Sequence, residues 1–232
     1  MKDPTVIAID GPAGAGKSTV ARELARKLGY IYIDTGAMYR AVTLKALQQQ
    51  VSVVDHEGLT HLAEASDITF ALDERNLEEP NRIYLDGQDV SRQIRTLEVS
   101  RHVSPVSTVA GVRSIFTELQ RKLARHGKVV MDGRDIGTTV LPDAGLKVFL
   151  TATIEERARR RYEELVKKGH QGVFSEVMED IQRRDSIDSQ REVSPLAQAV
   201  DAVLMDTTEL NIDQVVEHIM KLHREMTHSC GM

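Results

Sequence analysis

Short apolar runs alternate with longer amphipathic segments along most of the chain. The runs are rich in aliphatic and β-branched residues, a composition that predicts buried strands. We expect such strands at residues 5–10, 30–33, 128–132, 146–151 and 202–206. Helical periodicity predicts helices at residues 17–28, 35–50, 155–168 and 210–225. Strands that alternate with helices predict a three-layer α/β fold around a five-stranded parallel sheet.

Residues 67–90 depart from this rhythm, because apolar and polar residues alternate there. Ile68, Phe70 and Leu72 form one such series, and Ile83 and Leu85 form a second. The pair at positions 86 and 87, Asp-Gly, is a strong hairpin turn signal. We therefore predict one domain spanning residues 1–232 with a small, mostly β insertion at about residues 63–100.

Composition narrows the function classes. The chain has 232 residues, 41% hydrophobic and 28% charged, which fits one globular domain with a core of aliphatic side chains. Its net charge of −5 argues against a general nucleic-acid-binding protein.

Cellular location is predicted from cysteine usage and from apolar segments. Cys230 is the only cysteine, so no internal disulfide can form. We see neither a signal-peptide pattern nor an apolar run of the roughly 18 residues needed to span a membrane. We expect a cytoplasmic monomer without a membrane or nucleic-acid partner. His218, His223 and His228 lack the spacing of a helical metal pair, and we expect them in a solvated tail.

A phosphate-binding loop follows the first predicted strand and leads into the first predicted helix. Its sequence matches G-x-x-x-x-G-K-[ST]. The predicted nucleotide-binding residues are Gly11, Pro12, Ala13, Gly14, Ala15, Gly16, Lys17, Ser18 and Thr19. Glycines let backbone N–H groups turn toward phosphate oxygens, and the helix dipole adds positive potential. We expect this loop to bind ATP, with Lys17 on the β- and γ-phosphates and the Ser18 hydroxyl on Mg²⁺.

A triphosphate site does not by itself name a reaction. The sequence has no Asn-Lys-x-Asp motif of the kind that GTPases use for guanine. A motor or transporter ATPase would usually be larger, so a small-molecule kinase fits better. Such a kinase needs a second anion site in line with the γ-phosphate, and arginine suits that task.

Arginines lie where a second anion site is expected. Arg40 follows the second predicted strand and Arg134 follows the third, and ligands of open α/β sheets bind beyond the carboxyl ends of strands. Each has an alternative interpretation. Arg40 fits an exposed helix position, and Asp34 or Thr35 fits a helix cap. Arg157 and the arginines at 159, 160 and 161 fit a solvated face paired with glutamates.

Several segments together resemble one family. They are residues 9–18 (IDGPAGAGKS), 34–40 (DTGAMYR), 89–91 (DVS) with 94–96 (IRT), 132–138 (DGRDIGT) and 184–191 (RDSIDSQR). In this order they resemble bacterial cytidylate kinases over nearly the whole chain. The resemblance implies transfer of a phosphoryl group from ATP to CMP or dCMP, giving CDP or dCDP, in pyrimidine nucleotide metabolism.

The resemblance also implies site residues. By this resemblance, phosphate would be held by Arg40, Arg134 and Arg191, and the cytosine would be surrounded by Ser104, Arg113 and Asp135. The ribose would be reached by Arg184 and Asp188. The same site would also be lined by Thr35, which is a serine in many relatives. The segment at about residues 154–170 resembles a lid, with Arg157 and Arg160 as candidate catalytic arginines beside Lys17, Arg134 and Arg191. An arginine with a carboxylate suits cytosine, whose amino group donates beside ring acceptors.

Two alternatives stay open at this point. The first is a kinase for another small acceptor, such as UMP, AMP or shikimate. The second is a regulatory module that binds ATP and transfers nothing. The many acceptor-side arginines argue against the second.

Overall fold

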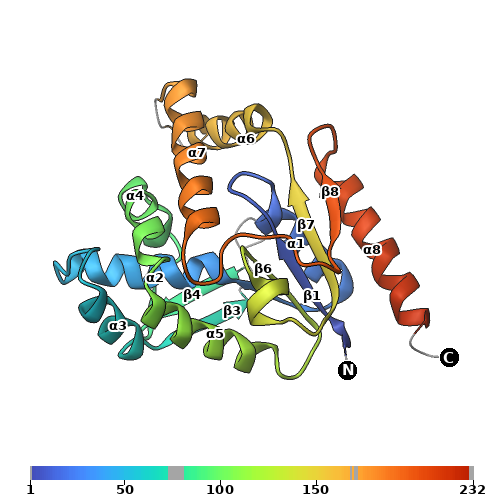
Figure 1. The fold of residues 1–232 in the computed structure, drawn as a ribbon, viewed down its shortest axis with the longest axis horizontal. Helices are drawn as coiled ribbons and strands as arrows, with labels where there is room; N and C mark the ends of the chain where they lie inside the picture. The colour runs from blue at the N-terminus through green and yellow to red at the C-terminus, as the bar shows by residue number, and fades with distance from the viewer. Residues whose placement is uncertain (1, 73–80, 168, 170–171, 230–232) are drawn as a thin grey trace. The chain divides into compact units, whose positions relative to one another are not determined.

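A computed structural model describes residues 2–72, 81–167, 169 and 172–229 (Figure 1). The chain forms two compact units: Met1–Tyr32 with Ala124–Met232, and Ile33–Leu123. Parts of three predictions lie outside the described residues: 73–80 of the insertion, 168 and 170 of the lid, and the tail with Cys230. The boundaries that we predict for the insertion and the lid stay predictions.

The first unit is built on the predicted five-stranded sheet. Its strands are β1 (Asp3–Asp10), β2 (Ile31–Asp34), β6 (Val129–Gly133), β7 (Ala144–Thr151) and β8 (Val203–Asp206). Their order is β2-β6-β1-β7-β8, and β1 pairs in parallel with both β6 and β7. Because Asp10 pairs with Gly133, β1 and β6 end at the same level. The predicted fold class is therefore confirmed, and the phosphate-binding loop leaves from the central strand.

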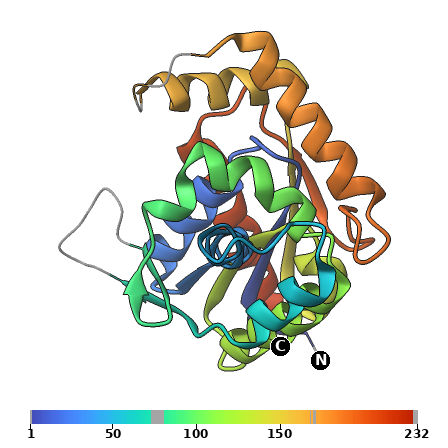
Figure 2. The same cartoon turned by 90° about the vertical axis from the view of Figure 1, so that its left-hand side faces the viewer.

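Helices of the first unit cover the sheet and extend beyond it. They are α1 (Lys17–Leu28), α6 (Ile154–Lys167), α7 (Phe174–Gln190), α8 (Ile212–Ser229) and a π-helical turn, η2 (Ile136–Val140). Leu24 of α1 and Ile219 of α8 pack into one buried cluster with Ile9 of β1. Helices α6 and α7 run side by side in both Figure 1 and Figure 2. Gly29 ends α1 in the left-handed conformation.

The second unit combines helices with a small antiparallel sheet, visible in green and cyan in Figure 2. Its elements are α2 (Thr35–Gln48), α3 (His56–Glu64), β3 (Ile68–Leu72), β4 (Asn81–Leu85), β5 (Gln88–Asp89), a 3₁₀ turn η1 (Gln93–Arg95), α4 (Leu97–Val106) and α5 (Ala110–Ala124). Asp86 and Gly87 form the predicted turn with positive φ values of 52° and 78°. Lys45 of α2 fastens that turn through a 2.7 Å ion pair with Asp86.

The expectation of a solvated histidine tail is wrong for His223. Its side chain is buried on α8, and its Nε2 lies 3.2 Å from the Tyr30 hydroxyl. The two rings meet edge to face with centroids 5.7 Å apart. The apolar positions of α8 turn this histidine toward the core with Ile219, four residues earlier. His218 is exposed, and the side chain of His228 lies outside the described residues.

Neither a membrane span nor a metal cluster is found in the described part of the chain. No helix there is long and apolar enough to cross a membrane. The same residues contain no group of three or more histidine, cysteine, aspartate or glutamate side chains placed to hold a metal ion.

Candidate active site

The phosphate-binding loop is shaped by glycines with positive φ. Gly11 has φ of 147°, and a Cβ at this position would lie 2.0 Å from the carbonyl oxygen of Leu150 on β7. Gly16 adopts the left-handed conformation directly before α1. It offers no side-chain cap, so the first N–H groups of a 12-residue helix point toward the loop. These groups and the positive end of the helix dipole suit an anion.

Lys17 is buried at the start of α1. Its Nζ donates a 2.7 Å hydrogen bond to the carbonyl oxygen of Pro12. Burial lowers the pKa of Lys17 well below its ordinary value, and the positive charges of Arg134 and Arg184 lower it further. Three cationic side chains of the first unit thus repel one another at the loop, and an anion placed among them would relieve that repulsion.

Arg134 leaves the end of β6 and is held by a carboxylate on α7. Its Nε donates to Asp188 Oδ2 at 2.8 Å, and its Nη1 donates to the Gly133 carbonyl at 3.3 Å. Burial has the largest single effect and acts to lower the pKa of Arg134, but the charge and hydrogen bond of Asp188, with the charges of Asp132 and Asp185, together raise it. The guanidinium group is therefore fixed in orientation and remains charged.

Arg184, one turn earlier on α7, has no such partner for one of its nitrogens. Its Nε is buried and makes no hydrogen bond among the described residues. Burial, followed by repulsion from Arg134, lowers the pKa of Arg184 to about 10. A buried donor without a partner is costly, so this atom is suited to receive a ligand acceptor.

Arg191 and Asp135 form a second buried pair in the same unit. Arg191 Nη2 donates to Asp135 Oδ1 at 3.0 Å, and its Nε donates to the Ser194 carbonyl at 2.6 Å. Its Nη1 lies 4.0 Å from Asp188 Oδ1. Asp188 therefore lies beside two of the predicted phosphate-binding arginines, and the structure brings four predicted residues together: Arg134, Asp135, Asp188 and Arg191.

Asp10, the last residue of β1, fixes the backbone that carries Asp135. Its two carboxylate oxygens accept N–H bonds from Ile136 at 2.8 Å and Gly137 at 2.7 Å. Burial raises the pKa of Asp10 to about 6, against the two backbone hydrogen bonds. A Cβ at Gly137 would lie 3.3 Å from Asp10 Oδ2, so glycine allows this close approach.

Ser18 and Asp132 form the oxygen pair that best fits a magnesium ion. The Ser18 hydroxyl donates to Asp132 Oδ2 at 2.8 Å, and Tyr32 donates to the other carboxylate oxygen, also at 2.8 Å. A hydroxyl and a carboxylate are hard ligands, and Mg²⁺ completes its shell with water and phosphate oxygens. The donor set fits the predicted Mg²⁺.

The two candidate lid arginines bind the protein's own backbone. Arg157 donates from Nε to the Ala152 carbonyl at 3.0 Å and from Nη1 to the Ala13 carbonyl at 3.0 Å. Arg160 donates to the Thr207 hydroxyl at 3.0 Å and to the Thr207 carbonyl at 2.5 Å. A Cβ at Gly16 would lie 3.8 Å from Arg160 Nη1, so Arg160 is close to the loop.

The remaining arginines of α6 fit the alternative of a solvated face. Arg159 is exposed and pairs with Glu156 and Glu163, and Arg161 pairs with Glu164 at 2.7 Å. Pairs of this kind contribute little to stability.

The second unit holds the other predicted acceptor residues. Arg40 Nη1 donates to the Ser100 hydroxyl at 2.9 Å and to the Ile94 carbonyl at 3.3 Å, so Arg40 is not merely an exposed helix residue. Thr35 is the buried first residue of α2, and the cap is Asp34, which accepts from the Ala37 N–H at 3.0 Å.

Arg113 of α5 is almost fully buried in the second unit. Its Nη1 donates to the Ser107 carbonyl at 3.1 Å, and its guanidinium carbon lies 5.6 Å from the centre of the Tyr39 ring. Ser104 lies on α4, where its carbonyl accepts from the Ser107 hydroxyl at 2.8 Å. Ser107 thus links the segments that carry Ser104 and Arg113, the predicted cytosine-binding residues of the second unit.

Three residues of the first unit were not predicted as site residues. Asp132 carried a signal, because an aspartate that ends a buried strand next to the phosphate-binding loop can reach its hydroxyl. Asp185 lies in the segment that resembles the family, yet the sequence does not show that it touches the loop. Tyr32 gives no signal, since an aromatic residue in a strand usually packs in a core.

Comparison with known proteins decides the family. The sequence model described as Cytidylate kinase matches residues 7–225. The chain belongs to the cytidylate kinase family. A cytidylate kinase of Caldanaerobacter subterraneus subsp. tengcongensis is 53% identical over 221 residues, 95% of each chain. A cytidylate kinase of Bacillus licheniformis is 52% identical and covers 96% of this chain and 97% of that one.

A solved structure supports the fold alone. An uncharacterized protein from Eubacterium ventriosum superposes with a TM-score of 0.51 at 11% identity, covering 96% of this chain and 99% of that one. Membership of the cytidylate kinase family confirms the resemblance seen in the sequence.

Proposed function

We propose that the chain transfers the γ-phosphoryl group of ATP to CMP, giving ADP and CDP. The observation that carries this function is the geometry of the first unit, where Lys17 lies buried at the phosphate-binding loop and carboxylates hold Arg134 and Arg191 in fixed orientations. The charge of Arg134 lowers the pKa of both Lys17 and Arg184, after burial. Enzymes hold such unfavourable arrangements where a ligand neutralises them. Family membership and the relatives' names support the same reaction.

The donor side consists of the loop from Gly11 to Thr19. Backbone N–H groups and Lys17 would bind the ATP phosphates, and Ser18 and Asp132 would hold Mg²⁺. When bound, the ion neutralises phosphate charge and fixes the phosphate geometry. The hydrogen bond from Tyr32 keeps the Asp132 carboxylate turned toward Ser18.

The acceptor side in the first unit would use three arginines that are buried or partly buried. Arg134 and Arg191 would bind the phosphate of CMP, because Asp188 and Asp135 already fix their planes. Arg184 would donate its unpartnered Nε to the ribose. Asp135 would accept from the cytosine amino group.

The predicted acceptor residues of the second unit are Thr35, Arg40, Ser104 and Arg113. We keep their roles as implied by the family resemblance: phosphate for Arg40, cytosine for Ser104 and Arg113. The hydrogen bonds of Arg40 and the ring contact of Arg113 give both guanidinium groups a defined orientation within that unit.

The reaction needs positioning and charge neutralisation rather than a strong base. An oxygen of the CMP phosphate attacks the γ-phosphorus, the bond from that phosphorus to the bridging oxygen breaks, and ADP leaves with the electron pair. The attacking oxygen is already anionic, so no proton has to be removed. Lys17 and the arginines stabilise the equatorial oxygens of the transferred group.

The finer predictions complete this proposal. We expect dCMP to be accepted as well, a lid at about residues 154–170 with Arg160 near the donor phosphates, and a cytoplasmic monomer with no nucleic-acid or membrane partner. Arg160 supports the lid role because it lies close to Gly16.

A substrate panel tests the proposal. Purified protein with ATP and Mg²⁺ is assayed for ADP release with CMP, dCMP, UMP, AMP or shikimate at equal concentration. We expect the highest kcat/KM with CMP or dCMP. A higher kcat/KM with UMP, AMP or shikimate would show that this compound, rather than CMP, is the acceptor. Binding of ATP with no CDP formed would favour the regulatory module instead.

A further inference from the structure

Both backbone polar groups of Ala13 in the phosphate-binding loop are bound by one ion pair, Arg157 with Asp185. The Ala13 N–H donates to Asp185 Oδ1 at 3.0 Å, and the Ala13 carbonyl accepts from Arg157 Nη1 at 3.0 Å. The same Arg157 nitrogen also pairs with Asp185 Oδ2. We call Arg157, Asp185 and the backbone N–H and carbonyl of Ala13 the loop clamp. It fixes the backbone three residues after the end of β1.

The clamp is anchored in the sheet and tightly packed. Arg157 Nε donates to the Ala152 carbonyl, directly after β7, and Arg157 is only 8% exposed. A Cβ at Gly14 would lie 2.9 Å from the Arg157 carbonyl oxygen, so α6 rests directly on the loop. Both Nε and Nη1 of Arg157 are thus engaged by protein atoms.

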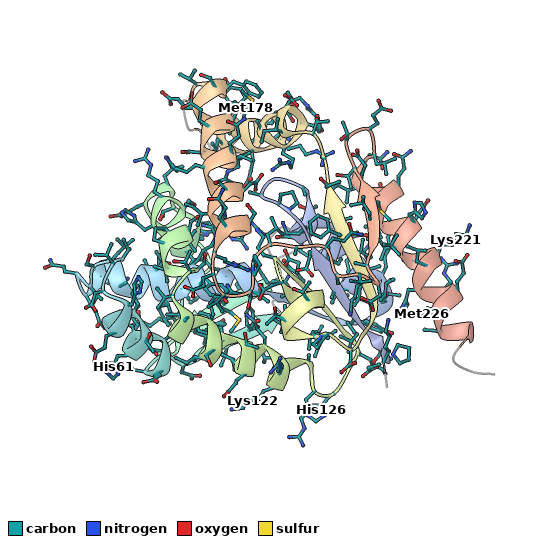
Figure 3. All side chains as sticks on the ribbon, viewed as in Figure 1. His61, Lys122, His126, Met178, Lys221 and Met226 are labelled. Atoms are coloured by element: carbon teal, nitrogen blue, oxygen red, sulfur yellow. The ribbon has the colours of Figure 1, made fainter. Side chains whose placement is uncertain are left out.

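Apolar contacts seal the clamp from the lid side. Ala13 packs with Ala158 of α6 and with Val177 and Ile181 of α7. Met178, labelled on α7 in Figure 3, packs against the same cluster. Low solvent access strengthens the ion pair and raises the cost of leaving either charge alone.

The clamp joins the donor loop to the helix that carries acceptor residues. Asp185 follows Arg184 and precedes Asp188 by three positions on α7. A shift of α7 when CMP binds would therefore move an acceptor of the Ala13 N–H. Donor and acceptor sites within the first unit share this contact.

We propose that Arg157 and Asp185 are positioning residues for ATP, which resets the sequence-based expectation that Arg157 is catalytic. Arg157 neutralises a carboxylate that touches the phosphate-binding loop, and the pair holds the loop in its binding shape. The inference rests on the proposed function only for the identity of the donor. Without Arg157, the Asp185 carboxylate would face an incoming triphosphate and repel it.

This charge logic predicts an asymmetric variant series. R157M leaves an unneutralised carboxylate at the loop. D185N keeps an oxygen for the Ala13 N–H and removes the negative charge. The double variant R157M/D185N removes the repulsion again. The matched control is D180N, which breaks the exposed pair with Arg183 on the same helix.

Calorimetric titration of each variant with ATP and Mg²⁺, without CMP, tests the inference. We expect ATP binding to be at least about 10-fold weaker in R157M and less than about 3-fold weaker in D185N. The double variant should bind ATP more tightly than R157M, and D180N should bind ATP as tightly as wild type. Hydrogen exchange at residues 11–19 should rise in R157M and D185N and stay unchanged in D180N.

Two outcomes would overturn the inference: R157M binding ATP as tightly as D180N, or the double variant binding no better than R157M. A merely structural role would lower thermal stability without this rescue. If R157M does not fold, R157K is compared with D185N instead. Lysine keeps the positive charge but cannot make the three contacts of the arginine side chain. Unchanged hydrogen exchange at residues 11–19 in R157K would then contradict the clamp. Because ATP binding is read directly, wild-type protein that binds ATP but makes no CDP would refute the proposed function alone.

Discussion

Buried charges in the first unit are arranged for a ligand rather than for the stability of the free protein. Burial lowers the pKa of both Lys17 and Arg184, so each charge costs folding energy in the free chain. Arg134 avoids that cost through Asp188. Positive groups that are already in place before an anion binds form a preorganised site. Phosphoryl transfer depends on such preorganised positive groups around the phosphates.

Replacing Lys17 separates catalysis from stability. We expect K17A to lower kcat by about 100-fold or more, because one donor to the transferred group is lost. The thermal midpoint should stay within a few degrees of wild type or rise, since a buried, poorly solvated ammonium group is removed. Parallel turnover and calorimetry measure the two effects. Near-normal turnover in K17A would refute the role of the loop.

Tyr32 is expected to tune the dependence on Mg²⁺. Y32F removes the hydrogen bond that orients Asp132, an interaction of about 1 kcal/mol. We expect the Mg²⁺ concentration for half-maximal rate at saturating ATP to rise roughly fivefold, the equivalent of that energy. Y30F is the matched control, because it loses a hydroxyl that faces His223 instead. Equal Mg²⁺ dependence in Y32F and Y30F would contradict the role of Tyr32.

His223 should make the free energy of unfolding sensitive to mild acid. Burial lowers the pKa of His223 in the folded state, so below about pH 6.5 the unfolded chain takes up a proton that the folded chain resists. Stability from this group is present above that pH and is lost as the pH falls through the lowered pKa. Urea unfolding at pH 7.5, 6.5 and 5.5 measures the slope.

The variant H223Q should flatten that pH dependence, whereas H218Q, on the exposed side of the same helix, should leave it unchanged. Asp10 acts in the opposite direction: burial raises its pKa to about 6, so its contribution falls as the pH rises from about 4 through 6. Both variants keep Asp10, which cancels in the comparison. A slope in H223Q equal to that of wild type would show that His223 does not titrate on unfolding.

Among the elements, α7 contributes most to the site. It supplies Arg184, whose buried Nε we propose for the acceptor, Asp185, which accepts from the Ala13 N–H, and Asp188, which accepts from Arg134. The ends of β1 and β6 supply further site residues, since their register pairs Asp10 with Gly133, directly before Gly11 and Arg134 in the sequence. The apolar periodicity of a helix does not show which of its polar residues reach a site, so the contact of α7 with the loop could not be predicted from periodicity.

Alanine substitutions at Gly11, in the phosphate-binding loop, and at Gly29, at the end of α1, separate steric crowding from the cost of a positive φ. G11A would place a Cβ 2.0 Å from the Leu150 carbonyl at a φ of 147°, and G29A would impose φ of 66° on alanine in open space. We expect G29A to cost about 1 kcal/mol of stability with unchanged turnover, the usual left-handed penalty. G11A should cost more and abolish measurable ATP binding. Equal behaviour of the two variants, by urea unfolding and calorimetric titration, would contradict the tight approach of the loop to β7.

For the chain as a whole, the sequence predicts the sheet well and the contacts of the site only in part. Strand runs, the glycine-rich turn and the Asp86-Gly87 hairpin are local signals, and each is confirmed. The loop clamp joins residues 13, 157 and 185, and the pair of Arg134 with Asp188 joins helix to strand. Such contacts depend on tertiary packing, which a single sequence does not encode in any short pattern.

The same limit explains the error at His223. Irregular histidine spacing excludes a helical metal pair, but it does not report that the apolar face of α8 turns one of the three into the core. Family resemblance adds what periodicity lacks, since it assigns roles to residues far apart in the chain. It does not distinguish an arginine that touches substrate from one that positions the protein backbone, the role that we propose for Arg157.

A crystal structure with CMP and a non-hydrolysable ATP analogue would show directly whether both phosphate sites exist. We expect the analogue's phosphates on the loop within hydrogen-bonding distance of Lys17, and the CMP phosphate bound by Arg134 and Arg191 in line with the γ-phosphate. A CMP phosphate bound away from these arginines, or a triphosphate bound away from Lys17, would contradict it.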